Sequence, residues 1–135
     1  MAYNGYIMKF GNDEFDMGWI FRDTFAITPN RRQDLDSYRN ANGKLVRNVL
    51  DHTATTITFQ SKPMTRHNFA LMMEFIRDHF SNAQERKLSI TYYSPDINAY
   101  KTGNFYMPDF EVSTIMQKKS GELLYNTCTL EFIEY

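Results

Sequence analysis

Few residues in this chain combine a type and a spacing that could support metal binding or catalysis. The three histidines are His52, His67 and His79. A helix is expected around His67 and His79, and at about 100° per residue they would lie roughly 120° apart around its axis, near opposite ends. The two cannot share one metal ion. No cysteine or histidine pair has the spacing of a zinc site, so we expect no metal and no cofactor.

The remaining reactive side chains also favour structure over catalysis. Cys128 is the one cysteine, and its place on the apolar face of an expected strand predicts a buried, inert thiol. Carboxylates cluster at residues 13–16 and at Asp34 and Asp36, but the first cluster lacks the glycine and the terminal glutamate of a calcium-binding loop. There is no Gly-rich phosphate loop and no Gly-x-Ser-x-Gly elbow. We therefore predict that the chain is not an enzyme; a small cell-wall hydrolase is the least favoured alternative.

The composition is neither strongly basic nor strongly acidic. Fifteen Lys and Arg stand against 16 Asp and Glu, for a net charge of -1. Both signs are spread along the chain, so we predict no sequence-specific nucleic-acid binding. A single cysteine excludes an intrachain disulfide and fits folding in a reducing cytoplasm. No apolar run reaches the length of a signal peptide or a membrane span, so no membrane partner is expected.

The most informative feature is a polar stretch from Thr28 to Leu45, set inside a β pattern rich in aromatic residues. These residues cannot build a core. A loop of this length is uncommon in a compact domain unless it is functional or disordered. Asn42-Gly43 is a strong hairpin signal because both residue types tolerate positive φ. We therefore expect an ordered arm over about residues 29–50 that reaches out to another polypeptide.

The charged and aromatic residues of this arm are its candidate contacts with another subunit. Mixed signs at high density suit ion pairs and bidentate guanidinium contacts between copies. Two alternatives stay open: a flexible, solvated loop, and nucleic-acid binding, which the interleaved aspartates disfavour. The predicted subunit-interface residues are Arg31, Arg32, Asp34, Asp36, Tyr38, Arg39 and Arg47.

Strands are predicted on both sides of the arm. Before it, residues 5–10 are predicted to form a short strand, and residues 17–21 and 24–28 one or two more. Pro29 is expected to end the last of them because it cannot donate to a ladder. After it, residues 53–60 alternate between apolar and polar faces.

One helix is predicted over about residues 66–81, with Thr65 as its N-cap. Apolar residues recur at helical spacing and predict packing on a sheet. This stripe consists of Phe69, Met72, Met73, Ile76 and Phe80, widened by Leu71 and Phe75.

Two hairpins are predicted after the helix. The first joins residues 88–92 to 99–107, with Gly103 marking a bulge or a close backbone approach. The second joins residues 109–117 to 123–135. Short sequential hairpins imply antiparallel pairing, and one striped helix implies a sheet covered on one side. The predicted fold is mainly β (α+β): an antiparallel split β-barrel or sandwich with one packed α-helix and a long projecting arm, as a single domain over residues 1–135.

Five segments together carry a resemblance to a known family. They are residues 21–39 (FRDTFAITPNRRQDLDSYR), 42–45 (NGKL), 47–53 (RNVLDHT), 91–96 (TYYSPD) and 100–109 (YKTGNFYMPD). In these segments the chain resembles a family of short proteins encoded in the tail modules of long-tailed phages and prophages of Gram-positive bacteria. The resemblance covers nearly the whole chain. It implies a location in the virion tail more than a chemical mechanism.

The expected order of elements also resembles the split-barrel domain of phage tail tube proteins and the ring domain of distal tail proteins. In that fold, as the resemblance implies, subunits join their sheets into hexameric rings around a lumen, and the arm reaches an adjacent subunit or ring. Larger distal tail proteins have a second, carbohydrate-binding domain, for which this chain has no room. Direct binding to the host is therefore not implied.

These observations favour a non-enzymatic structural component of a phage tail. We expect a homomeric ring, hexameric by resemblance, at the distal tail or baseplate, in contact with neighbouring tail proteins. Two alternatives remain open. One is a tail tube or tube-terminator subunit, and the other is a monomeric adaptor whose arm binds a receptor-binding protein.

Overall fold

The computed structural model describes residues 3–34, 38–46, 49–119 and 121–135, with the backbone alone at 33, 34, 46 and 49–52. In chain order the elements are β1 (Met8–Phe10), β2 (Asp13–Glu14), the 3₁₀ helix η1 (Met17–Trp19), β3 (Ala26–Asp34), β4 (Tyr38–Arg39), β5 (Leu45–Val46), β6 (Val49–Gln60), β7 (Met64–Thr65), α1 (Arg66–Asp78), β8 (Lys87–Ser94), β9 (Ala99–Tyr106), β10 (Thr114–Gln117), β11 (Leu123–Tyr125) and β12 (Thr129–Glu134). The predicted mainly β class with one helix is confirmed.

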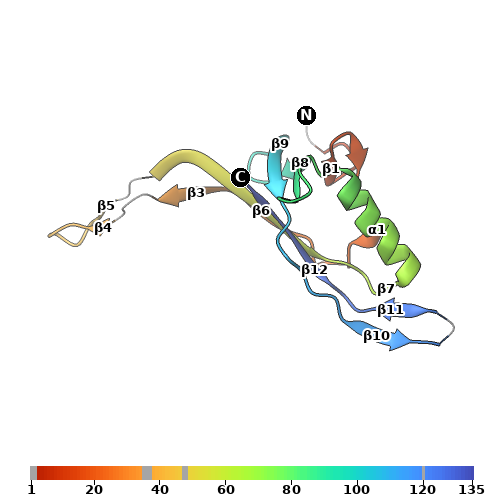
Figure 1. The fold of residues 1–135 in the computed structure, drawn as a ribbon. Coiled ribbons are helices and arrows are strands. Elements are labelled where there is room, and N and C mark those ends of the chain that lie inside the picture. The colour runs from red at the N-terminus through yellow and green to blue at the C-terminus, as the bar shows by residue number, and fades with distance from the viewer. Residues whose placement is uncertain (1–2, 35–37, 47–48, 120) are drawn as a thin grey trace.

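The main sheet has seven strands in the order β2-β1-β8-β9-β12-β6-β3. Every neighbouring pair in it is antiparallel, as the short hairpins predicted. The sheet has two free ends, β2 and β3, so it is not closed into a barrel. A small sheet of β10, β11 and β7 continues from it. Figure 1 shows β3 and β6 leaving the body on one side and the β10–β11 hairpin on another.

The core lies between α1 and one face of the main sheet. On β6, Ile57 and Phe59 are fully buried, and Leu130 and Phe132 face them from β12. Aromatic rings extend this core: the Phe10 ring lies 5.3 Å from Phe132, between centroids. The predicted alternation of residues 53–60 is confirmed, because burial of every second side chain drives this face of β6 against the helix.

Helix α1 begins where the sequence predicts. The Thr65 hydroxyl accepts a hydrogen bond from the Asn68 amide at 3.4 Å, which caps the first turn. Met72 and Ile76 are fully buried against the sheet. The prediction for Leu71 is wrong, because this side chain is 45% exposed. It precedes Met72 by about 100° around the helix, which turns it away from the sheet.

Two predicted strand boundaries before the arm are wrong. Residues 17–19 form η1, because the Asp16 carboxylate accepts from the Gly18 amide at 2.8 Å and caps a tight turn. Pro29 does not end β3. The register of β3 against β6 shifts between Thr28 and Arg31, and Asn30 has a φ of 47°. Pro29, which has no N–H to donate, therefore lies within an irregularity of the ladder, and the strand continues beyond it.

The second half also departs from the predicted hairpins in detail. Gly103 pairs with Ile90 in an unbroken register, so no bulge exists there. The close approach is confirmed, because a Cβ on Gly103 would collide with the Glu134 carboxylate. The predicted last strand is divided into β11 and β12, with residues 126–128 between them. Of residues 109–117, only β10 is a strand.

Candidate functional site: the arm and its anchoring network

The arm is a two-stranded ribbon. β3 and β6 pair from Ala26 opposite Thr58 out to Asp34 opposite Val49. Beyond them β4 and β5 pair with each other. The ribbon projects far from the body to the left of Figure 1. Among the described side chains, none between Ile27 and Ala54 belongs to the core. The described part of the arm therefore projects from the body without helping to build its core.

The arm tip is a tight turn held by its own hydrogen bonds. The Gly43 amide donates to the Asn40 carbonyl at 2.9 Å, and Gly43 takes a φ of 79°, which favours glycine. The Asn40 side-chain oxygen accepts from the amides of Asn42 at 3.0 Å and Lys44 at 3.1 Å. The Arg39 guanidinium donates to the Gly43 carbonyl at 2.9 Å. The hairpin predicted at Asn42-Gly43 is confirmed, with Gly43 as the residue that needs the positive φ.

The predicted interface residues lie in two groups along the arm. Arg31 and Arg32 are exposed on β3 near its base. Tyr38 and Arg39 are exposed on β4 at the tip, where Tyr38 is 56% exposed. The backbone of Asp34 lies opposite Val49, but its side chain is outside the described residues, as are Asp36 and Arg47 as a whole. A role for these seven residues in subunit contacts stays a prediction.

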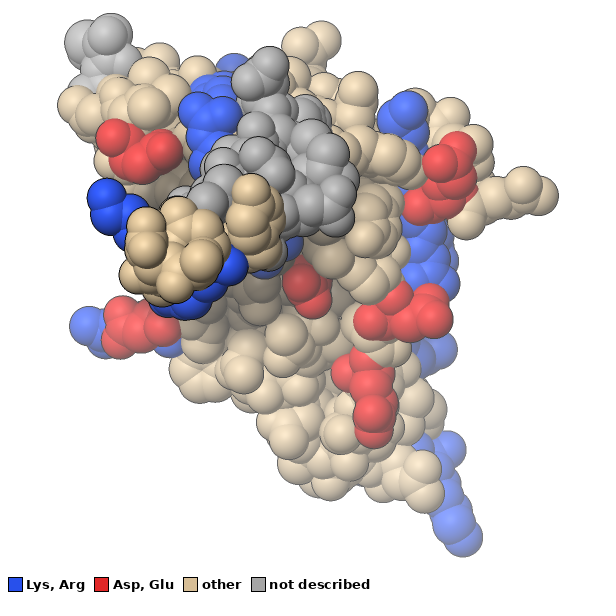
Figure 2. Space-filling view, turned by 90° about the vertical axis from the view of Figure 1, so that its left-hand side faces the viewer, with Lys and Arg blue, Asp and Glu red and all other residues tan. Residues whose placement is uncertain are grey.

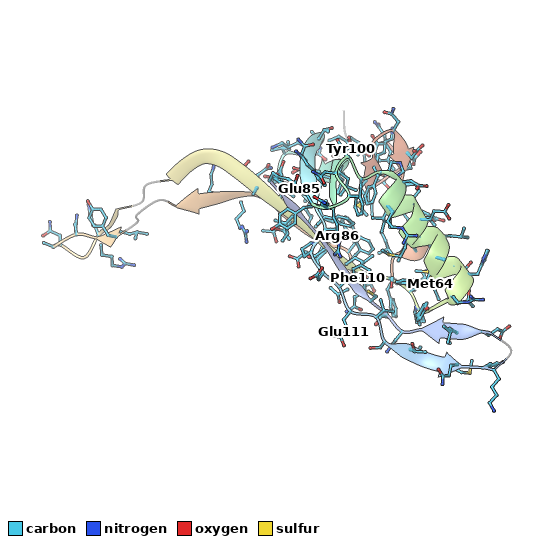
Figure 3. The ribbon with its side chains drawn as sticks, viewed as in Figure 1. Met64, Glu85, Arg86, Tyr100, Phe110 and Glu111 are labelled. Atoms are coloured by element: carbon cyan, nitrogen blue, oxygen red, sulfur yellow. The ribbon has the colours of Figure 1, made fainter. Side chains whose placement is uncertain are left out.

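Side chains of the body crowd between the sheet and α1, whereas those of the arm stand in the open (Figure 3). In the end-on view of Figure 2, Asp and Glu side chains gather on the body to the right of the arm. The tip presents Tyr38 and Leu45, which are 56% and 51% exposed. Because Tyr38 pairs with Val46 and Arg39 with Leu45, the two apolar side chains lie on opposite faces of the ribbon.

A polar network anchors the base of the arm to the β8–β9 hairpin. The Asn30 side-chain amide donates to Asp96 at 2.8 Å and to Ser94 at 3.3 Å. Its oxygen accepts from the Lys101 ammonium at 2.6 Å. Ser94 in turn donates to Asp96. The positive φ of Asn30 thus aims its side chain from the strand irregularity into the turn that follows β8, and this contact fixes where the ribbon leaves the sheet.

The network continues into buried side chains of the sheet. The backbone N–H of Asn30 donates to the Thr55 hydroxyl at 3.0 Å. The same hydroxyl is hydrogen-bonded to the Tyr92 hydroxyl at 2.9 Å. Thr55 and Tyr92 are both fully buried. The Thr55 amide donates to the Glu134 carboxylate at 2.9 Å. Fully satisfied buried networks of this kind make a local structure rigid.

Two groups of the network have shifted pKa values. The hydrogen bond from Ser94, followed by the one from Asn30, lowers the pKa of Asp96, because both stabilise its ionised form. Burial raises the pKa of Tyr92, since the phenolate would lose its hydration. At neutral pH the network therefore holds an ionised Asp96 and a neutral Tyr92.

Sequence reasoning missed this network. Asn30 and its partners in the β8–β9 hairpin are distant in sequence, and only the fold brings them together. Residues 94–98 were interpreted as the turn of the first hairpin, with no predicted contact to Asn30. The available signal was Asn30 directly after Pro29, because asparagine tolerates positive φ where a proline disturbs a strand.

The candidate reactive groups do not converge. Cys128 is buried, and burial raises the pKa of its thiol, which matches the predicted inert cysteine. His79 bonds the Phe75 carbonyl at 2.7 Å and Asp13 at 2.8 Å. Within the described part of the chain, no three His, Cys, Asp or Glu residues lie where they could hold a metal ion. Nor is any helix among these residues long and apolar enough to cross a membrane.

A family model covers the whole chain. The Family of unknown function (DUF6711) matches residues 1–135. The chain belongs to this family. No curated protein matches it in sequence.

One solved structure resembles this DUF6711 chain at low similarity. It is a chain in the tail of an empty GTA particle with C6 symmetry, with 16% identity and a TM-score of 0.48. The match covers 99% of this chain and 95% of the other. A likeness at that level is too weak to transfer a function.

Proposed function

We propose that this chain is a non-enzymatic structural subunit of a phage or prophage tail, and that it assembles with copies of itself into a ring at the distal tail or baseplate. The observation that carries the proposal is the arm, an ordered ribbon that projects from the body with an exposed tip. Its exposed apolar side chains, Tyr38 and Leu45, would be covered by contact with another chain. The tail location comes from the resemblance of segments such as residues 21–39 and 100–109 to tail-module proteins.

The geometry supports an assembly of the head-to-tail kind. The arm leaves one end of the main sheet, at β3, and the other end, at β2, is a separate surface. A contact between two different surfaces repeats around a ring when the rotation closes. Both ends of the sheet are unpaired edges among the described residues, and such edges are available for pairing with another chain. By its resemblance to split-barrel tail proteins, the ring is a hexamer of single-domain subunits.

In this role the arm works by position and not by chemistry. The anchoring network holds its base, and the self-bonded turn holds its tip, so little conformational entropy is lost when it docks. The arginines of the arm supply charge-assisted contacts that fix the register between copies.

The experiment that tests this function shortens the arm without touching the body. Asp34 lies opposite Val49, so residues 35–48 can be replaced by an Asn-Gly turn that closes the same ribbon. We expect the shortened chain to keep its stability to urea and its far-ultraviolet circular dichroism, and to lose ring formation in light scattering and negative-stain images. A shortened chain that still forms the same rings contradicts the proposal. A point variant of the tip, Tyr38→Ala, provides a second reading if the shortened chain does not fold.

A further inference from the structure

An apolar groove lies on the body just before the arm begins. It has a volume of about 380 Å³, and Met17, Phe21 and Phe25 contribute apolar walls, with Arg22 and Asp23 beside them. Met17 is 44% exposed and Phe21 is 39% exposed. Such side chains normally gain free energy when a partner covers them.

The groove is built on a rigid turn. The Phe21 amide donates to the Gln60 carbonyl at 2.7 Å, and the Thr24 hydroxyl donates to the Phe21 carbonyl at 2.6 Å. The first bond ties the turn to the end of β6 in the body, and the second closes the turn on itself. The groove is therefore present before any partner binds, which lowers the cost of docking.

The segment that carries part of the groove and the arm have net charges of opposite sign. Residues 11–23, which carry part of the groove, include four Asp or Glu and one Arg, for a net charge of -3. The arm, residues 29–50, includes five Lys or Arg and two Asp, for a net charge of +3. Two surfaces of opposite charge attract and orient each other during association. The arm of this same sequence is therefore opposite in charge to the segment that carries part of the groove, and its exposed Tyr38 and Leu45 suit the apolar walls.

The arm of the same molecule cannot reach its own groove. Phe25 immediately precedes β3, which has nine residues. At about 3.3 Å per residue, β3 alone carries the chain roughly 30 Å away from the groove before the tip begins. The β3–β6 pairing and the anchoring network hold this part of the ribbon away from the groove. An arm that fills the groove must come from another copy.

We propose that the groove of Met17, Phe21 and Phe25 is the receiving site for the arm tip of a neighbouring copy. The tip inserts Tyr38 or Leu45, and the cations of the arm approach the acidic segment around Asp16 and Asp23. This inference rests on the proposed self-assembly and specifies its contact surface. Each subunit then presents its arm tip beyond one end of β3 and its receiving groove before the other end. This is the head-to-tail arrangement that a ring requires.

Cysteine pairing between differently tagged copies tests the contact. One copy carries Tyr38→Cys or Leu45→Cys and the other carries Phe21→Cys. The native Cys128 is buried and stays in every variant. We expect at least one tip cysteine to form a mixed disulfide with the groove cysteine under mild oxidation. A Leu71→Cys copy is the matched control, because Leu71 is 45% exposed on α1, and it should give no such product.

Substitutions in the groove provide a second measurement. Met17→Asp and Phe21→Asp should each weaken self-association at least about tenfold, as expected when an apolar anchor site is lost. Leu71→Asp should leave self-association unchanged. Raising the salt concentration should also weaken assembly, because the attraction between the arm and the acidic segment is screened.

The outcomes separate this inference from the proposed function. If arm shortening abolishes assembly but the groove substitutions have no effect and no tip cysteine pairs with Phe21→Cys, the receiving site lies elsewhere and the inference is wrong. If Phe21→Cys copies link to each other without any tip cysteine, groove meets groove and the inference is also wrong. If the intact chain stays monomeric, the proposed self-assembly itself fails.

Discussion

Removing the Thr55 hydroxyl should lower the free energy of unfolding by more than the loss of one hydrogen bond would. This buried hydroxyl serves both the Asn30 amide at 3.0 Å and the Tyr92 hydroxyl at 2.9 Å. Thr55→Val keeps nearly the same shape but leaves both of these groups without this partner. Each orphaned polar group costs roughly 1–3 kcal/mol, so we expect a loss of about 3 kcal/mol in the free energy of unfolding.

Removing the Tyr92 hydroxyl, the partner in the same hydrogen bond, should lower the free energy of unfolding by less. Tyr92→Phe removes the phenol but leaves the Thr55 hydroxyl with the Asn30 amide, so the expected loss is about 1 kcal/mol, one net hydrogen bond. In the double variant the orphaned phenol is gone, and only the Asn30 amide lacks its partner. The double variant should therefore lose about 2 kcal/mol, less than the sum of the two single losses, because the two residues share one interaction.

Urea unfolding of the unaltered chain, the two single variants and the double variant measures this double-mutant cycle directly. Hydrogen exchange at the Asn30 amide provides the local readout, and it should become faster in Thr55→Val while the amides of α1 stay protected. Additive losses within about 0.5 kcal/mol would refute the reasoning. So would a Thr55→Val variant no less stable than Tyr92→Phe, because the arm base would then not depend on this hydroxyl.

Three further predictions concern the body and the arm base. Thr65→Ala should lower the free energy of unfolding by about 1 kcal/mol through loss of the helix cap, while Thr65→Ser should restore most of it. Leu130→Ala, at a fully buried position, should cost about 2–5 kcal/mol in the same urea assay. The folded pKa of Asp96 is lowered, so its contribution is present above the unfolded pKa and is lost as pH falls through the folded pKa. The protection of amides at the arm base, measured relative to their intrinsic exchange rate at each pH, should therefore fall in acid, and Asp96→Asn should remove that pH dependence.

Local signals in the sequence predicted the elements that depend on neighbouring residues. The Thr65 cap and the Met72–Ile76 stripe lie within a single helix, and Gly43 lies within one turn. Each can be read from a few consecutive positions, because the partners are three or four residues apart.

The errors arose where distant partners decide the structure. Pro29 was expected to end a strand, but the contact of Asn30 with the β8–β9 turn and the long β6 partner carry β3 past it. Residues 17–19 were expected to be a strand, but the Asp16 cap favours a tight turn there. The anchoring network depends on the fold as a whole, so the sequence pattern could mark Asn30 after Pro29 but neither the partners of Asn30 nor the groove beside Phe21.

The arm and its anchor together suggest why a small protein keeps so long an extension. In the proposed assembly a flexible extension would lose entropy on docking, whereas the hydrogen bonds described at the base and the tip restrict those parts of the arm already in the folded chain. If the chain assembles as proposed, the same few hydrogen bonds at the base link the stability of the body to the geometry of the assembly.

The central claim is that the arm joins copies of this chain to each other. Its most direct test is the mass of the unaltered chain in solution, measured by light scattering or native mass spectrometry over a range of concentrations. We expect a discrete closed oligomer, a hexamer, that appears as a ring in negative stain. A chain that remains a monomer at the highest concentrations would contradict the account.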